Sequence, residues 1–216
     1  QWVGPIAEYQ SVGNSSYNGL LLNVRKRAAQ GVTLNANYTW SHCISPDQDT
    51  LNGSLYSPQD TYVFVGDRDR GRGNCTSDRR HNTNLSAVAE MPRFANNRLR
   101  MLASGWRLST IYRYTTGSYM SITAGPGVDT ARNGTSVTQQ PANQVLPNPY
   151  GDRSGRPRSQ WFNVAAFQQP AIGTLGNMGR RNVVGPSQWD FDLALSRVFQ
   201  IKEGQRLEFR AEAYNV

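Results

Sequence analysis

Apolar and polar side chains alternate at every position of residues 32–41, which is the clearest pattern in the chain. Five apolar residues would share one face of a β-strand: Val32, Leu34, Ala36, Tyr38 and Trp40. The residues that alternate with them are polar: Thr33, Asn35, Asn37, Thr39 and Ser41. Because successive side chains of a strand point to opposite sides, this segment predicts a strand with one apolar and one polar face.

Further segments repeat this alternation, so we expect about six strands in the chain. The expected strands are 18–28, 32–41, 82–91, 106–116, 189–199 and 206–214. We find no convincing amphipathic helix, and no apolar run approaches the roughly 18–20 residues that a membrane helix needs. The expected fold class is therefore all-β.

The connections between the expected strands alternate between shorter and longer. Residues 29–31, 92–105 and 202–205 form the shorter connections, whereas 42–81 and 125–188 form the long ones. Because alternate connections of a meander lie at the same end, all the long ones fall at one end. Bacterial outer-membrane barrels have this asymmetry, with short periplasmic turns and long extracellular loops.

Aromatic residues mark both ends of the expected strands. Five lie near the long-loop ends: Tyr38, Trp40, Tyr112, Tyr114 and Trp189. Trp106 and Phe199 lie near the short-turn ends. Two aromatic belts are typical of a barrel that crosses two membrane interfaces. The pattern favours an antiparallel transmembrane β-barrel, present in part, over a soluble β-sandwich.

Composition is consistent with strands that are half polar. The chain of 216 residues is 38% hydrophobic and has a formal net charge of +8, with a mean hydropathy of −0.61. Basic residues are spread along the chain and are locally dense only in 67–80. We therefore expect no nucleic-acid partner and consider anionic lipopolysaccharide instead.

The two cysteines, Cys43 and Cys75, lie in the same expected loop. In an oxidising compartment we expect them to pair and close that loop. Two free thiols are the alternative, and a metal site that adds His42 and His81 is another. Zinc fingers use tighter spacing within each ligand pair, so the disulfide is favoured over the metal site.

No motif in the sequence points to catalysis. There is no nucleophile elbow, Walker loop or dinucleotide fingerprint. Carboxylates alternate in 67–74, as in a calcium loop, but arginines interrupt them and the later bidentate Glu is absent. We expect no enzyme activity, no cofactor and no metal.

Short segments in a shared order carry a resemblance to a known family. They are GNSSYNGL (13–20), KR (26–27), ANYTWS (36–41), DRRHN (78–82), GWRLS (105–109), WFNVAAF (161–167), GTLGN (173–177) and RLEFRAEAYN (206–215). The chain resembles the late barrel of TonB-dependent outer-membrane receptors, in particular the Oar-like group with a carboxypeptidase-regulatory-like N-terminal domain.

The resemblance implies a large barrel of roughly 22 strands with a plugged lumen. Residues 1–216 would then be a fragment of one barrel domain that lacks the plug, the TonB-contacting box and the N-terminal regulatory-like domain. About six strands alone would leave two open edges, which lipid does not tolerate.

Charged residues on the polar faces of the expected strands would face the barrel lumen. They are Arg25, Arg27, Arg107, Arg113, Asp190, Asp192, Arg206, Glu208, Arg210 and Glu212. Their opposite charges would pair with one another and with the plug. The functional alternative is a charged path that opens when the plug moves.

The resemblance implies a receptor integral to the bacterial outer membrane. It would bind a substrate with its extracellular loops and admit it past the plug, driven by the TonB complex through the missing N-terminal part. Trp161, Phe162 and Phe167 are candidates for ligand contact in a folded patch of the longest loop, although packing against neighbouring loops is favoured. The candidates for lipopolysaccharide contact are Arg72, Arg79 and Arg80.

Two other functions stay open. One is an outer-membrane adhesion or structural barrel without transport. The other is a secreted β-sandwich that binds carbohydrate through its aromatic side chains.

Overall fold

A computed structural model describes residues 14–27, 31–45, 69–92, 94–96, 98, 103–125, 128–132 and 140–216. The chain divides into two compact units. We call Gly19–Trp40, Arg80–Thr116 and Ser187–Val216 the sheet unit. We call Gln1–Asn18, Ser41–Arg79 and Gly117–Pro186 the loop unit.

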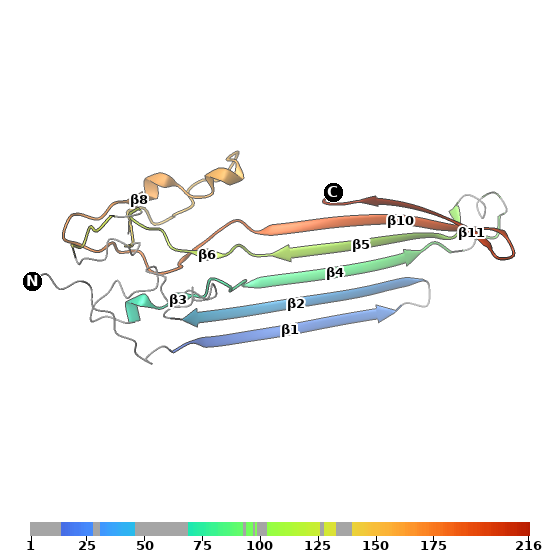
Figure 1. Cartoon of the computed structure of the whole chain (residues 1–216), viewed down its shortest axis with the longest axis horizontal. Helices are drawn as coiled ribbons and strands as arrows, with labels where there is room; N and C mark the ends of the chain where they lie inside the picture. The colour runs from blue at the N-terminus through green and yellow to red at the C-terminus, as the bar shows by residue number, and fades with distance from the viewer. Residues whose placement is uncertain are drawn as a thin grey trace, which may run out of the picture. The chain divides into compact units, whose positions relative to one another are not determined.

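Six long strands form a meander in which each strand pairs with the next one along the chain. They are β1 (Ser16–Arg27), β2 (Val32–Ser45), β4 (His81–Glu90), β5 (Trp106–Thr115), β10 (Gln188–Lys202) and β11 (Gln205–Ala213). Neighbouring long strands run in opposite directions (Figure 1). The predicted all-β, antiparallel fold class is confirmed.

The end of β2 differs from the prediction. Alternation stops at Ser41, yet the strand continues to Ser45 because its last residues pair with β3 (Gly73–Asn74). Ile44 lies opposite Asn74 and Ser45 opposite Gly73. The first residues of the expected loop 42–81 are therefore part of a strand. Their pairing with β3 holds them extended, although the sequence does not alternate there.

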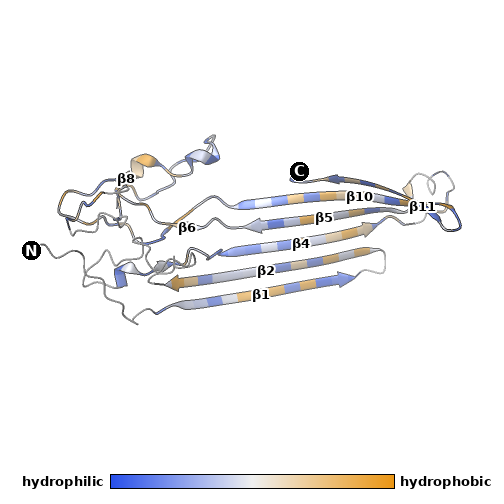
Figure 2. Cartoon of the chain, viewed as in Figure 1, coloured by the Kyte–Doolittle hydropathy of each residue, from blue (hydrophilic) through white to orange (hydrophobic). Residues whose placement is uncertain are grey.

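The register gathers the apolar side chains on one face of the sheet unit. Paired residues in an antiparallel sheet point to the same side, and Leu34, Ala87, Thr110, Leu193 and Ala213 form one such row across five strands. Figure 2 shows the alternation of hydrophobic and hydrophilic residues along the strands. We call this side the apolar face.

The opposite side, the polar face, continues across the same strands. Asn37, Asn84, Arg113 and Asp190 form one row on it. The Asn23 amide of β1 donates to the Asn37 side chain. That bond places the odd-numbered residues of β1 on the polar face, because side chains alternate along a strand.

Aromatic residues of the apolar face lie at both ends of the strands, as predicted, and Tyr112 lies opposite Phe191 one row further in. At the long-loop end, Tyr38, Tyr114 and Trp189 share one row with Thr83. At the other end, Trp106 lies opposite Arg197, which lies opposite Phe209. The Trp106 and Phe209 rings meet edge to face, with their centroids 5.9 Å apart.

The two outer strands each have one strand neighbour within the described part of the chain. They are β1 and β11, and all their residues are exposed. Each outer edge therefore presents backbone N–H and C=O groups that the meander itself does not pair.

The loop unit has its own short elements. Its paired strands are β6 (Tyr119–Met120) with β9 (Val183–Val184), and β7 (Asn143–Gln144) with β8 (Phe167–Gln168). Its 3₁₀ helices are η3 (Asp69–Gly71), η4 (Arg158–Gln160) and η5 (Val164–Ala166). Among the described residues, no helix has the length and apolar content to cross a membrane.

A small apolar core lies within the loop unit. Ala142, Met178 and Val183 are buried in it. The partly buried side chains packed against them are Met120, Ile122, Phe162 and Phe167. The longest predicted loop is therefore folded well beyond the aromatic patch that the sequence suggested.

Candidate functional site

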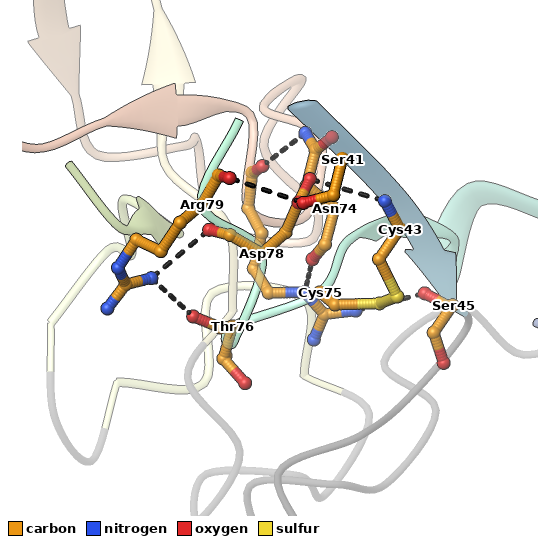
Figure 3. Close-up of a disulfide and its surroundings, with 9 residues drawn as sticks. Ser41, Cys43, Ser45, Asn74, Cys75, Thr76, Asp78 and Arg79 are labelled. Atoms are coloured by element: carbon orange, nitrogen blue, oxygen red, sulfur yellow. Dashed lines mark hydrogen bonds between the residues drawn. A yellow bond between two sulfur atoms is a disulfide. The ribbon is translucent and has the colours of Figure 1, made fainter. Parts of the chain in front are cut away.

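A disulfide joins the end of β2 to the residue that follows β3 (Figure 3). Cys43 and Cys75 are bonded, with a Cα–Cα distance of 5.4 Å and a sequence separation of 32. The Cys75 N–H also donates to the Cys43 carbonyl at 3.0 Å. The predicted disulfide is present. The alternative metal site with His42 and His81 is wrong, because both thiols are used in the bond.

Asp78 is a buried carboxylate beside this disulfide (Figure 3). It accepts hydrogen bonds from the Ser41 hydroxyl at 3.0 Å and from the Cys43 N–H at 3.3 Å. The next residue, Arg79, donates from Nη1 to the carbonyls of Thr76 and Asp78, at 3.0 and 3.1 Å. These bonds hold the chain that leads into β4 against the end of β2.

Arg181 links the two long connections within the loop unit. Its side chain is buried, and Nη2 donates to the Ser45 carbonyl at 2.9 Å while Nε donates to the Asn74 carbonyl. The Asn74 amide donates back to the Arg181 carbonyl at 2.9 Å. Gly73 is required here, because a Cβ at that position would lie 2.1 Å from the Arg180 carbonyl oxygen.

The three aromatic ligand-contact candidates pack inside the loop unit. Tyr150 stacks on Phe162 with ring centroids 5.7 Å apart, and Phe162 meets Phe167 edge to face at 6.3 Å. The Trp161 indole N–H donates to the Val184 carbonyl at 2.7 Å. All three side chains therefore make contacts within the loop unit, and ligand contact stays a prediction.

The guanidinium of Arg153 lies over the ring of Trp161. The Arg153 guanidinium carbon lies 3.2 Å from the ring centroid, which is cation–π geometry. Tyr150, which the sequence did not single out, completes the cluster by accepting a hydrogen bond from the Val184 N–H at 2.8 Å. Its partners are distant in sequence, so no local pattern could have identified it.

The charged candidates of the strands all lie on the polar face. They are Arg25, Arg27, Arg107, Arg113, Asp190, Asp192, Arg206, Glu208, Arg210 and Glu212. Arg107 forms an ion pair with Glu90 at 2.6 Å, and Arg210 pairs with Glu212. Arg113 lies directly opposite Asp190. Both ion pairs are accessible to solvent, so they add little to stability.

The arginines proposed for lipopolysaccharide differ in their surroundings. Arg72 is exposed on the loop unit, whereas Arg79 is partly buried and donates to backbone carbonyls. Arg80 is partly buried and belongs to the sheet unit. Of the three, Arg72 has the most accessible side chain.

The calcium-like segment 67–74 lies partly outside the described residues. Asp69 and Arg70 belong to η3, and the Arg70 guanidinium donates to the Gly176 carbonyl at 2.6 Å. Across the described part of the chain, no group of three or more His, Cys, Asp or Glu residues is placed to hold a metal ion.

The family comparison decides what this sheet is. The family model of the outer membrane beta barrel domain matches residues 1–216. The chain belongs to this family. A search of curated proteins and a search of solved structures each found no match.

An outer-membrane barrel domain is integral to the outer membrane, so the two faces of the sheet lie in different environments. The apolar face is the side that contacts lipid, and the polar face is the side that contacts water. The long-loop end of the strands corresponds to the extracellular side in such barrels.

Proposed function

We propose that this outer-membrane barrel domain belongs to a TonB-dependent receptor of the Oar-like group. It would bind a substrate with its extracellular loops and admit it past a plug, with energy supplied by the TonB complex. The barrel itself would carry out no covalent chemistry.

The polar face of the sheet is the observation that carries this proposal. Acidic and basic side chains alternate along β11, and Arg113 faces Asp190 across β5 and β10. A lumen wall of mixed charge favours a wet interior that can hold a polar plug or pass a polar substrate.

The folded loop unit supports the same proposal. A disulfide, the buried Asp78 and the buried Arg181 fix its backbone. Binding sites on loops work best when the loops are held rigid before the ligand arrives, because less entropy is then lost on binding. The substrate would contact the exposed surface of this unit.

Conductance of the full-length gene product in planar bilayers tests the receptor function. A receptor with a plug should be closed, and removal of the plug should open a large pore. TonB dependence is the second measurement, since the purified TonB C-terminal domain should bind the intact protein. A protein that is closed in both forms and ignores TonB would contradict transport.

The favoured alternative is an adhesion or structural barrel. Val164 of η5 and Ile172, at 83% and 72% exposure, are apolar side chains that a partner surface could cover. Membership of the outer-membrane family argues against the third option, a secreted carbohydrate-binding sandwich.

A further inference from the structure

The residues of the apolar face that are charged at neutral pH are all basic, among the paired strands that the structure describes. They are Lys26 on β1, and Arg197 and Lys202 on β10. All three lie near the short-turn end: Arg27 ends β1, Arg197 lies opposite Trp106, and Lys202 ends β10, where it lies opposite Gln205 after a register shift. A face that contacts lipid therefore has positive charge at one end.

Arg197 lies among aromatic rings. Its guanidinium carbon is 4.5 Å from the centroid of the Phe199 ring and 5.4 Å from that of Trp106. Phe209 lies opposite Arg197 on β11. Because Phe199 is two residues nearer the short-turn end, the guanidinium extends towards that end of the strand. An arginine side chain that extends in this way keeps its guanidinium near water while its aliphatic part is buried.

The length of the strand places Arg197 near a membrane interface. Trp189 and Phe199 are the aromatic residues that bound the apolar side of β10, and they enclose the roughly 9–11 residues that a barrel strand uses to cross the hydrocarbon core. Arg197 lies just inside this boundary. An arginine is costly at the centre of the bilayer and nearly neutral at its interfaces.

We propose that Arg197 binds the phosphate of an anionic phospholipid in the periplasmic leaflet, with Trp106, Phe199 and Phe209 packing against the adjoining glycerol and acyl carbons. The short turns of outer-membrane barrels are periplasmic, which places this end in the phospholipid leaflet. The planar guanidinium matches a phosphate with two parallel hydrogen bonds. Charge complementarity identifies the occupant, because the charged residues of this face, Lys26, Arg197 and Lys202, are all cations. The inference goes beyond the proposed receptor function and does not depend on transport.

Lipid binding to the purified full-length protein tests the site. Phosphatidylglycerol is titrated into the detergent-solubilised protein, and bound lipid is counted by native mass spectrometry. We expect Arg197→Gln to weaken binding about fivefold, the effect of one basic side chain near anionic lipid. Arg197→Lys should keep most of the affinity, and Arg113→Gln on the polar face of the neighbouring strand is the matched control. Equal binding by wild type and Arg197→Gln, or an equal loss in Arg113→Gln, overturns the proposal.

A second measurement needs no variant and separates two sources of phosphate. Phosphatidylglycerol and lipid A, each with a photoreactive headgroup, are cross-linked to the wild-type protein in vesicles, and the modified peptides are mapped. Cross-links from phosphatidylglycerol to the segments around Trp106 and Phe199 support the site. Cross-links there from lipid A, or phosphatidylglycerol cross-links confined to the segments around Trp40 and Trp189, overturn it.

Discussion

Single buried polar residues hold the loop unit together. Asp78 and Arg181 are both 3% exposed, and each bonds to groups far away in the sequence. A buried charge is tolerated only when hydrogen bonds replace the water that it has lost. The disulfide could be predicted, because two cysteines in an extracytoplasmic loop have few alternatives. Neither Asp78 nor Arg181 could be, since their partners lie 37 and 136 residues away.

Replacement of Asp78 should loosen the loop unit. Asp78→Ala leaves the Ser41 hydroxyl and the Cys43 N–H without this acceptor, and we expect a loss of about 2–3 kcal/mol in the local stability of the segment. Proteinase K cleavage on intact cells measures it, because a loosened loop is cut faster. Asp69→Ala, which removes an exposed carboxylate of η3, is the control. Equal cleavage rates for both variants would show that Asp78 does not hold the segment.

At the scale of elements, the strands follow directly from the sequence. The pleat fixes the alternation of faces, so a pattern such as that of residues 32–41 leaves little choice of structure. The extension of β2 to Ser45 and the short strands β6 to β9 could not be foreseen. Their pairing partners are non-local, and strands of two residues are too short to show any period.

The disulfide should stabilise the end of β2 and leave the sheet intact. A closed loop with a sequence separation of 32 gives about 3–4 kcal/mol in the chain-entropy model. The double variant Cys43→Ser, Cys75→Ser should therefore be cleaved faster by surface protease, while its heat-modifiable migration is retained. Reductant should reproduce this effect in the wild type and add nothing in the double variant. A variant that loses heat modifiability would show that the disulfide is needed for the barrel itself.

An introduced arginine should destabilise the barrel at one position of β10 and not at the neighbouring position. Leu193 points to the apolar face and Ala194 to the polar face. Leu193→Arg places a cation in lipid near the middle of the strand, at a cost of about 2–4 kcal/mol. Ala194→Arg, on the water side, is the matched control. Urea unfolding in detergent or lipid should show the loss for Leu193→Arg alone, and the reverse order would mean that the two faces are assigned the wrong way round.

At the scale of the whole molecule, the meander raises the question of what pairs with its outer strands. Every backbone polar group in the hydrocarbon core must be satisfied within protein, so open sheet edges do not occur there. Within the described residues, β1 and β11 each have a single strand neighbour. Bacterial single-chain barrels have at least eight strands. The sequence predicted this meander and its two faces, but alternation along a strand carries no information about what lies beyond an edge.

Further strands, from the same polypeptide or a second copy, should therefore close the barrel. We expect the 216-residue chain, refolded alone in detergent, to give no compact monomer whose migration changes on heating. A longer polypeptide that adds strands on both sides should give one, because those strands can satisfy both edges. Chemical cross-linking of the refolded chain separates the two sources of strands: a discrete, heat-modifiable oligomer would mean that copies of this segment close the barrel together. A heat-modifiable monomer of the chain alone would contradict the argument, since β1 and β11 would then have to pair with each other or with segments outside the described residues.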